Sequence, residues 1–452
     1  MSDLFAARSQ MAISLAFHIL FAVVGIGMPL LMVVAERRWL ATKDPIDLEL
    51  AKRWSKGTAI LFAVGAVSGT VLSFELGLLW PGFMELAGPL IGLPFSLEGF
   101  AFFTEAIFLG IYLYGWDRIP PRAHLLAGVM VAVSGAVSGI FVVLVNAWMN
   151  APTGFELVNG AITNIDPIKA LQSPAAFQQT LHMTLAAYAA TGFAVAGIHA
   201  LLLLREPMNT FHRRALAIAL LVGAPAALLQ PISGDISARN VARYQPAKLA
   251  AMEALFETRR SAPLLLGGWP DMETRTVRYG IEIPAGLSLL AAHDPDAEIA
   301  GLDQFPREDW PHVPTVHVAF QVMVGLGTAM ALVALWVIWT VARRRQIAEH
   351  PLLLKALAVC APFGFIAIEA GWTVTEVGRQ PWVVHGVLRT ADAVTPMPGL
   401  TYTLAGFTLL YVLLGIVVVW MLYSQIIKSP RDQDWHRIYS PAAATRPATE
   451  AR

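Results

Sequence analysis

A long apolar run ends in the stretch GWTVTEVGRQPW, residues 371–382, which carries a carboxylate, a guanidinium and two indoles. Lipid hydrocarbon tolerates such groups poorly, so their position at a membrane rim indicates function rather than packing. Trp and Arg favour the headgroup level, and interfacial anchoring accounts for Trp382 and for Arg379. Anchoring does not account for Glu376, because a carboxylate gains nothing from lying near lipid without a partner. We therefore treat Glu376 as a candidate functional residue.

The composition around this stretch is typical of a membrane protein. The chain has 452 residues, of which 56% are hydrophobic and 14% charged. Ordinary globular domains contain roughly a quarter charged residues. The formal net charge of +0 argues against nucleic acid as a partner, because nucleic-acid binding needs a basic surface. The single cysteine, Cys360, excludes both a disulfide framework and a thiolate metal site.

Nine segments are long and apolar enough to cross a membrane as helices: 11–35, 57–80, 95–115, 124–148, 178–204, 215–233, 314–341, 353–377 and 400–427. A span needs about 20 apolar residues, and helix is expected because lipid-exposed backbone must satisfy its own hydrogen bonds. The sixth segment is short and contains Pro225 and Pro231, so the pattern defines it least. The expected fold class is an all-α integral membrane protein.

Basic residues gather in every second connection between these segments. They are Arg37, Arg38, Lys43, Lys52, Arg53 and Lys56 after the first segment, Arg118 and Arg122 after the third, Arg205, Arg213 and Arg214 after the fifth, and Arg343, Arg344, Arg345 and Lys355 after the seventh. The connection 81–97 has none, and 149–177 has only Lys169. Because cytoplasmic loops are enriched in Lys and Arg, we expect the N-terminus outside and the C-terminus in the cytoplasm.

One connection, 234–313, is too long to be a simple link, and the orientation places it outside. Its apolar content predicts a folded lid, and comes from Trp269, Tyr279, Ile281, Ile283, Leu287, Leu289 and Leu290. The expected organisation is six transmembrane helices in 1–233, the external loop in 234–313, three helices in 314–428 and a disordered cytoplasmic tail in 429–452.

Six spans carry polar or ligand-type side chains in the outer half of the bilayer, as judged from the helical rise and this orientation. They are His18, Glu75, Glu98 with Glu105 some 10 Å deeper, His182, Met323 and Glu376. Imidazole and thioether at one depth suggest metal or haem ligands. No CxxCH motif is present, so any haem would be bound non-covalently.

Taken one at a time, these residues have plainer explanations. His18 and His182 could be packing histidines, Met323 a core filler, and the carboxylates could reach the rim. Glu105 is too deep to reach the rim and is typical of a proton path. We interpret His199 as a packing residue and His317 as an interface residue. We expect four further histidines in solvated loops: His124, His212, His350 and His385.

Histidine counting also narrows the class of redox protein. A haem–copper oxidase core needs six helical histidines, and only about four lie within or near spans here. A cytochrome b of the quinol–cytochrome c reductase type needs two facing histidine pairs, but only His182 and His199 share a span. Two rival classes remain. A structural scaffold predicts no polar cluster, and a proton-coupled transporter using Glu98, Glu105 and Glu376 predicts repeat symmetry that is not evident.

From Arg8 to about Tyr423 the chain resembles subunit I of the cytochrome bd-type quinol oxidases. The motifs that carry the resemblance are FH at 17–18, EGFAFFTE at 98–105, GWDR at 115–118, NAWM at 146–149, GD at 234–235, QPAKLAAME at 245–253, and the opening stretch 371–382. The resemblance implies a quinol:oxygen oxidoreductase. It would oxidise quinol at the outer face, reduce O2 with cytoplasmic protons, and build a proton gradient without pumping.

The resemblance also implies roles for single residues. His182 and Met323 would hold a low-spin haem b, whereas His18 and Glu376 would each ligate a high-spin haem of the oxygen-reducing pair. The other implied roles are Glu98 beside that pair, Glu105 and Ser138 in a proton path, Lys248 and Glu253 at the quinol, Arg379 paired with a haem propionate or with Glu376, and Trp372 next to the haems.

The implied cofactors are low-spin haem b, high-spin haem b, and either haem d or a third b-type haem. The implied partners are a polytopic subunit II, a small single-helix accessory subunit, quinol, O2 and the lipid of a prokaryotic inner membrane. Two features depart from better-known members. The external loop is short, as in a cyanide-insensitive branch, and Gln321 stands where those members have an arginine.

Overall fold

Long helices dominate the computed structural model, which describes residues 2–158 and 161–425. The tail expected at 429–452 lies outside the described residues. Within them, nine helical segments are long and apolar enough to cross a membrane, as the sequence predicted. They are α1 (Asp3–Thr42), α2 (Pro45–Leu79), α3 (Pro81–Tyr114), α4 (Pro121–Asn150), α6 (Ala176–Leu203), α7 (Thr210–Tyr244), α10 (Val313–Ala342), α11 (Pro351–Cys360) continued by α12 (Phe363–Val377), and α14 (Leu400–Gln425).

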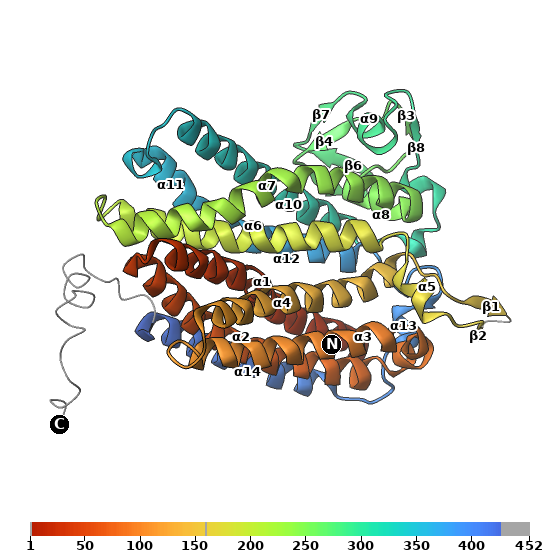
Figure 1. The fold of residues 1–452 in the computed structure, drawn as a ribbon. Coiled ribbons are helices and arrows are strands. Elements are labelled where there is room, and N and C mark those ends of the chain that lie inside the picture. Colours follow the sequence, from red (N-terminus) through yellow and green to blue (C-terminus); the bar gives the residue numbers. More distant parts are fainter. Residues whose placement is uncertain (1, 159–160, 426–452) are drawn as a thin grey trace, which may run out of the picture.

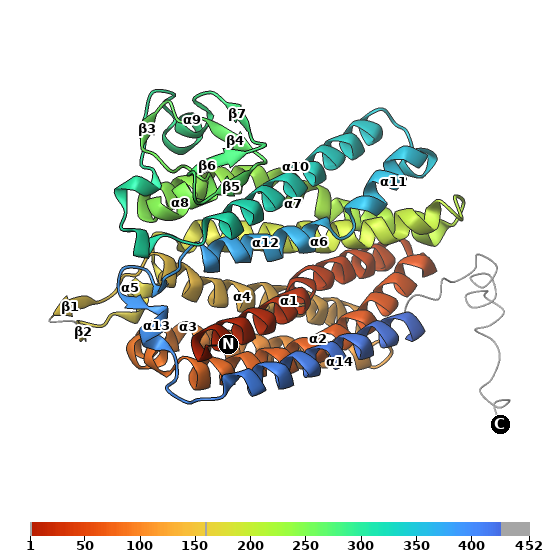
Figure 2. The same ribbon diagram turned by 180° about the vertical axis from the view of Figure 1, so that it is seen from behind.

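The helices form two groups that lie side by side (Figures 1 and 2). One group contains α1 to α4 with α14, and the other contains α6, α7 and α10 to α12. Contacts of α1 and α4 with α6 join the two groups. The connection 245–312 lies at one end of the bundle, which we call the loop end. The start of α1 lies at the loop end too, because Asp3 accepts backbone hydrogen bonds from Gly399 and Leu400 at the start of α14.

The prediction of a loop over 81–97 was wrong, because α3 begins at Pro81, directly after α2 and Trp80. Pro81 suits the first turn of a helix, where its missing N–H costs nothing. The interior Pro89 and Pro94 are tolerated because neighbouring elements bury this part of α3, including Phe83 and Leu90. Glu98 consequently lies near the middle of α3 and not at its mouth.

Two other helices differ from their predicted extent. The sixth segment continues as α7 through Pro225 and Pro231 to Tyr244, so the first part of the predicted external loop is helical. The eighth segment is broken at Ala361 and Pro362, between α11 and α12. The break separates α11, which packs in a core of the second helix group, from α12, which leads into the stretch 371–382.

The connection between α7 and α10 folds into short elements. They are α8 (Pro246–Met252), the strand pairs β3 (Arg259–Arg260) with β8 (Glu298–Ile299), β4 (Leu264–Leu266) with β7 (Ile281–Ile283) and β5 (Trp269–Asp271) with β6 (Thr276–Arg278), then α9 (Gly286–Ala292), η1 (Leu302–Gln304) and η2 (Arg307–Asp309). Its core contains Leu249, Phe256, Leu287 and Leu302. Of the seven apolar residues predicted to fold this segment, only Leu287 is buried there, and Tyr279 is 93% exposed.

Smaller elements close the loop end. A hairpin of β1 (Glu156–Val158) and β2 (Ala161–Thr163) precedes α5 (Pro167–Leu171), and β9 (Trp382–Val384), β10 (Leu388–Arg389) and α13 (Thr390–Ala393) follow α12. At the opposite end the single turn η3 (Ile347–Glu349) precedes α11. These short pieces cap the helix bundle and leave its interior to the long helices.

Close helix contacts depend on small residues, as expected where lipid gives no hydrophobic drive for helix association. A Cβ placed on Gly192 of α6 would lie 2.5 Å from the Cα of Gly223 on α7. Backbone cannot move away from such a contact as a flexible side chain can. The α6–α7 pair therefore requires glycine at this crossing.

We expect Gly192→Ala to lower the thermal unfolding midpoint of the purified complex, by an amount equivalent to about 1–3 kcal/mol, because overpacking forces the backbones apart. The matched control is Gly57→Ala in α2, where an added Cβ meets nothing within 4 Å. That variant should be neutral or stabilised, because alanine favours helix over glycine by about 1 kcal/mol. Equal midpoints for the two variants would contradict the close crossing.

Candidate functional site

Helix α12 ends at the loop end with the Glu376 carboxylate held from both sides. Its Oε1 accepts a hydrogen bond from Asn146 Nδ2 of α4, and its Oε2 pairs with Arg379 Nη2 at 2.6 Å. Arg379 is 2% exposed, and its Nε and Nη1 have no hydrogen-bond partner among the described residues. A buried guanidinium with two spare donors suits a further anionic group at this position.

The bond from Asn146 continues into the external connection. Asn146 Oδ1 accepts from Asn150 Nδ2 at 2.9 Å, and Asn150 Oδ1 accepts from Lys248 Nζ of α8 at 2.6 Å. Lys248 Nζ also donates to Gln245 Oε1 at 2.6 Å. A continuous run of hydrogen bonds therefore joins Lys248 to Glu376.

Burial shifts the pKa values of two titratable side chains in the connection 245–312, Lys248 and Glu253. It lowers the pKa of Lys248 well below its usual range; nearby Arg379 acts in the same direction, and Glu376 opposes it. Burial likewise raises the pKa of Glu253 to about 8, with a backbone hydrogen bond from Leu265 acting in the opposite direction. Both side chains are almost fully enclosed, so neither behaves as a surface residue.

The two candidate histidine ligands share one arrangement. His18 Nδ1 lies 2.9 Å from Ser68 Oγ, and His182 Nδ1 lies 2.9 Å from Ser233 Oγ. Each serine hydroxyl donates to a backbone carbonyl, Ser68 to Val64 and Ser233 to Gln230. A serine that donates to its carbonyl accepts from its histidine, and this arrangement favours the imidazole proton on Nδ1.

In this tautomer each Nε2 carries a lone pair, and that of His182 faces the amide donor Gln230 Nε2. An outer partner that holds Nδ1–H is the usual way in which proteins orient an imidazole for a metal. Next to His182 Nε2 lies Gln230 Nε2, at 3.1 Å, while the buried Gln230 Oε1 has no partner among the described residues. Nε2 is therefore the atom through which either histidine could hold a metal.

Glycine borders each of the three neutral candidate ligands. A Cβ added to Gly69 would lie 3.0 Å from His18 Cε1, one on Gly234 would lie 3.6 Å from His182 Cε1, and one on Gly371 would lie 3.0 Å from Met323 Sδ. These glycines provide room beside both rings and the thioether. A His/Met donor set flanked by glycine fits a haem, and Arg379 supplies spare donors for a propionate.

Trp372 joins the two helix groups beside these ligands. It packs on a buried cluster that includes Ile19 and Val23 of α1 and Ile368 of α12. Gly371, which faces Met323, directly precedes it, and Glu376 follows one turn later. The structure thus brings parts of the predicted site together along α12.

The remaining carboxylates lie between α1, α3 and α4. Glu98 Oε1 accepts from Ser138 Oγ at 3.1 Å. Glu105 is 5% exposed, and its Oε1 has no partner among the described residues. It lies in a niche where Gly25 and Gly135 allow backbone to approach, since a Cβ on Gly135 would come within 3.1 Å of Glu105 Oε1. A buried carboxyl without a fixed partner is suited to accepting and passing protons.

Three histidines were predicted wrongly. His124 is buried in α4, with Nδ1 2.8 Å from Glu36 and Nε2 2.9 Å from the Tyr112 carbonyl. His212 is buried in α7, and its Nδ1 lies 3.0 Å from His199 Nδ1. Both were expected in water because the predicted helices began too late. His317, expected at an interface, is fully buried and contacts two backbone carbonyl oxygens.

The other two histidines predicted in solvated loops, His350 and His385, are partly buried. His385 lies beside β9, and burial together with Lys248 and Arg379 lowers its pKa to about 4. Sequence reasoning also missed Glu369, an α12 carboxylate whose buried Oε1 has no partner among the described residues. Its position inside an apolar run was the signal that could have identified it.

Glu75 lies outside the groups already described. It accepts from Gln10 Nε2 at 2.8 Å, while Thr403 of α14 donates to Gln10 Oε1 at 2.8 Å. Gln321 anchors the external connection, because it donates to the Leu265 carbonyl and accepts from Gly267 N, both at 2.9 Å. An uncharged side chain at position 321 therefore serves to attach the loop.

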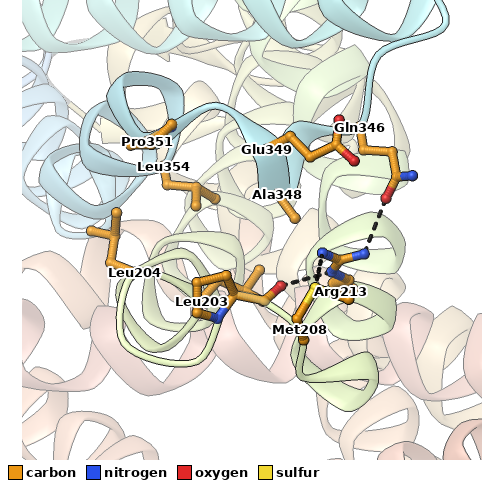
Figure 3. Close-up of a pocket in the computed structure, with 10 residues that line it drawn as sticks. Leu203, Leu204, Met208, Arg213, Gln346, Ala348, Glu349, Pro351 and Leu354 are labelled. Atoms are coloured by element: carbon orange, nitrogen blue, oxygen red, sulfur yellow. Dashed lines mark hydrogen bonds between the residues drawn. The ribbon is translucent and has the colours of Figure 1, made fainter.

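A pocket opens at the end of the bundle opposite the loop end (Figure 3). It lies between the α6–α7 and α10–α11 turns, and its lining includes Leu203, Met208, Arg213, Gln346 and Leu354. Arg213 spans it with hydrogen bonds to Pro207 O and Gln346 Oε1. The lining contains no candidate ligand or quinol-site residue, so we place the chemistry at the loop end.

Together, the fold and the site describe a multi-span membrane protein whose candidate haem ligands are histidine and methionine side chains. The family model of the cytochrome bd terminal oxidase subunit I matches residues 6–430. The chain belongs to this family. Membership excludes the transporter and scaffold classes.

Relatives of known description agree over nearly the full chain. A putative cytochrome bd menaquinol oxidase subunit I of Bacillus subtilis (strain 168) is 40% identical over 440 residues, 96% of this chain and 99% of its own. The cytochrome bd-II ubiquinol oxidase subunit 1 of Escherichia coli (strain K12) is 27% identical over 487 residues, covering 92% and 95%. The solved bd oxidase from Geobacillus thermodenitrificans superposes with a TM-score of 0.89 at 39% identity, covering 95% and 99%.

The chain is therefore subunit I of a bd-type terminal oxidase, and its activity is that of a quinol:oxygen oxidoreductase of a respiratory chain. The family uses haem cofactors, and bd oxidases contain a subunit II in addition. Such an oxidase is consistent with the inner membrane of a bacterium.

Glu253 predicts a pH dependence for the external connection. Its pKa of about 8 in the folded protein lies above the ordinary carboxyl value of the unfolded chain, so its contribution to stability is present below that value and is lost as the pH rises through 8. We expect 245–312 to be cleaved faster by limited proteolysis at about pH 9 than at about pH 6.

The Glu253→Gln variant should lose this pH dependence, because an amide stays neutral throughout the range. The exposed Glu257 lies on the same segment, so Glu257→Gln should keep the wild-type profile. An unchanged pH profile in Glu253→Gln would show that another group is responsible.

Proposed function

We propose that this subunit oxidises quinol at the loop end, on the outer face of the membrane, and reduces O2 with protons drawn from the cytoplasm. Protons released outside and consumed inside build a gradient without a pump. The N-terminus would lie outside and the C-terminus in the cytoplasm, in agreement with the distribution of Lys and Arg among the loops.

The pairing of each histidine, His18 and His182, with a serine hydroxyl through Nδ1 is the observation that carries this proposal. His182 and Met323 would hold the low-spin haem b, while His18 and Glu376 would each hold a high-spin haem. When bound, the haem held by His182 and Met323 would pass electrons, and the haems held by His18 and Glu376 would supply the oxygen chemistry. Arg379 would bind a propionate with its unpaired N–H groups, and Trp372 would fill the space between the ligand sets.

Quinol would bind beside α8. Lys248 and Glu253 are both buried, and Glu253 is protonated near neutral pH. A neutral carboxyl donates one hydrogen bond and accepts others, which matches a quinol that must lose protons. The relatives act on menaquinol or ubiquinol by name, so quinol is the substrate class proposed here.

Protons would reach the oxygen site through the carboxylates of α3. Glu105 has the free oxygen and the glycine-lined niche that a proton carrier needs, and Glu98 with Ser138 lies two helical turns nearer the start of α3. Glu98 would deliver protons beside the high-spin haems. This direction of transfer follows from the proposed orientation.

The third haem would be haem d or a further haem b. The short external loop favours the cyanide-insensitive branch, and a glutamine at 321 supplies no charge to stabilise the oxidised or reduced low-spin haem. We expect the potential of that haem to differ from members with arginine there. A spectrum with only b-type bands, at three haems per complex, would assign the branch without haem d.

The partners proposed for this chain are subunit II, a small single-helix accessory subunit and the surrounding membrane lipid. Helices α2, α3 and α14 expose large apolar side chains, among them Phe74, Phe100, Phe103, Leu409 and Trp420. An apolar face of this extent requires lipid or another membrane subunit to cover it. The place of action is the prokaryotic inner membrane, and nucleic acid is not a partner.

The haem assignment predicts a spectroscopic result for two matched pairs of variants. His182→Ala and Met323→Leu should abolish the low-spin b band in the reduced-minus-oxidised spectrum, because each removes one axial ligand. The controls, on the same helices, are His199→Gln and Met330→Leu, which should retain the band. Folded His182→Ala protein with its full low-spin band would refute the assignment.

The proton path predicts a kinetic result. Glu105→Gln should lower O2 consumption by about 100-fold or more and leave the haem spectrum unchanged, because the amide cannot carry a proton. Glu105→Asp should recover part of the rate. The control is Glu85→Gln, at an exposed position of α3. Wild-type turnover in Glu105→Gln would rule out this residue as a carrier.

A further inference from the structure

We infer that Lys248 of the external connection acts through Asn150 and Asn146 as a positioning residue for the Glu376 carboxylate, so that the quinol loop and the oxygen-site ligand form one hydrogen-bonded unit. The inference rests on the proposed function for the roles of its two ends. It assigns Asn150, which has no contact with either candidate haem ligand histidine, a place in the oxidase mechanism.

The direction of each hydrogen bond in this unit is set from the Lys248 end. Lys248 Nζ contributes N–H donors, so Asn150 must present its Oδ1 to it. The Asn150 amide nitrogen then faces Asn146, where it donates to both the side-chain oxygen at 2.9 Å and the backbone oxygen at 2.8 Å. Asn146 must in turn present its own amide nitrogen to Glu376. Neither amide can flip without losing a partner.

Because these side chains are buried, the loss of one hydrogen bond in the run is costly. Lys248, Asn150 and Asn146 are 4%, 2% and 8% exposed, so water offers little replacement for a lost hydrogen bond. Hydrogen bonds in a run with one direction polarise one another, and an unpaired buried group costs about 1–3 kcal/mol. Removing the donor at Lys248 therefore weakens the hydrogen bonds that hold Asn146, because the two residues are linked through Asn150.

Close packing gives a second, independent reason to couple the two ends. The aliphatic stem of Lys248 lies against Gly378, two residues after Glu376, where an added Cβ would come within 3.0 Å of Lys248 Cγ. The stem of the lysine is thus packed on the end of α12, while its nitrogen is bonded to the end of α4. Movement of α8 would be transmitted to both helices that hold the carboxylate.

The restrained carboxylate can still act as a ligand. A carboxylate has about four lone-pair sites, and Asn146 and Arg379 occupy one on each oxygen. Two sites remain for an iron bound at Glu376. Outer partners of a metal ligand typically change metal affinity by about 10–100-fold, which is the size of effect that the unit would exert on the haem at Glu376.

The test compares four single variants and one double variant of the whole oxidase complex, purified without quinol and analysed by haem stoichiometry and reduced-minus-oxidised spectra. Lys248→Met keeps the stem and removes the donors, Asn150→Leu removes the link, and Glu376→Ala removes the proposed ligand. Glu253→Gln is the control, because it changes a buried loop residue that forms no hydrogen bond with the unit among the described residues. The low-spin b band reports folding in every variant.

We expect Lys248→Met and Asn150→Leu each to weaken retention of the Glu376-held haem by about 10-fold or more, with the low-spin band intact. The double variant should lose no more than either single variant, because both cut the same run. Glu253→Gln should retain the full high-spin signal even where its quinol turnover falls.

Three outcomes would overturn the inference and can be told apart. If Glu376→Ala loses a haem but Lys248→Met and Asn150→Leu keep it, the unit is wrong and the ligand assignment stands. If Glu376→Ala keeps every haem, the ligand assignment fails and the inference fails with it. Additive losses in the double variant would show that Lys248 and Asn150 act separately.

Discussion

The structure depends on one constraint, which is that polar groups inside hydrocarbon are stabilised by partners on other helices. His18 is held by Ser68 across α1 and α2, and His182 by Ser233 across α6 and α7. Glu376 is held by Asn146 across α12 and α4. Each of these bonds orients a side chain and also joins two helices, so fold and site are stabilised by the same contacts.

Helix α12 is where these contacts converge. Its last turns, at the loop end, present Gly371 to Met323, Trp372 to the α1 cluster and Glu376 to α4. The chain divides this segment into α11, which packs in the core of the second helix group, and α12, which faces both groups. Because of the break at Pro362, the two halves of one span pack against different helices.

The external connection is attached to the bundle at three points. Lys248 bonds to the end of α4, Gln321 of α10 holds the strand β4 and the turn after it, and His317 of α10 contacts the carbonyl oxygens of Met252 and Gly267. Such anchoring keeps Glu253 enclosed, and enclosure is what raises its pKa. This connection is therefore fixed to the helix bundle by hydrogen bonds and does not lie loosely over it.

The sequence by itself determined the nine spans, their alternation and the candidate ligands. Membrane spans can be predicted from sequence because a helix that crosses hydrocarbon needs about 20 apolar residues in a row. The motifs around His18, Glu98 and Glu376 can be recognised because each is a short contiguous stretch. Helix ends were less readable. Residues 81–97 were predicted as a connection between two spans, but packing of Phe83 and Leu90 against distant segments made them helical.

Only the tertiary structure decided which polar groups meet. The proton on each histidine depends on a serine that lies 50 or 51 residues away, and the link from Lys248 to Glu376 joins positions from three separate elements. His124 and Glu36 form their buried pair across 88 residues of chain. Such pairings follow from how helices cross, and no local pattern of residues encodes them.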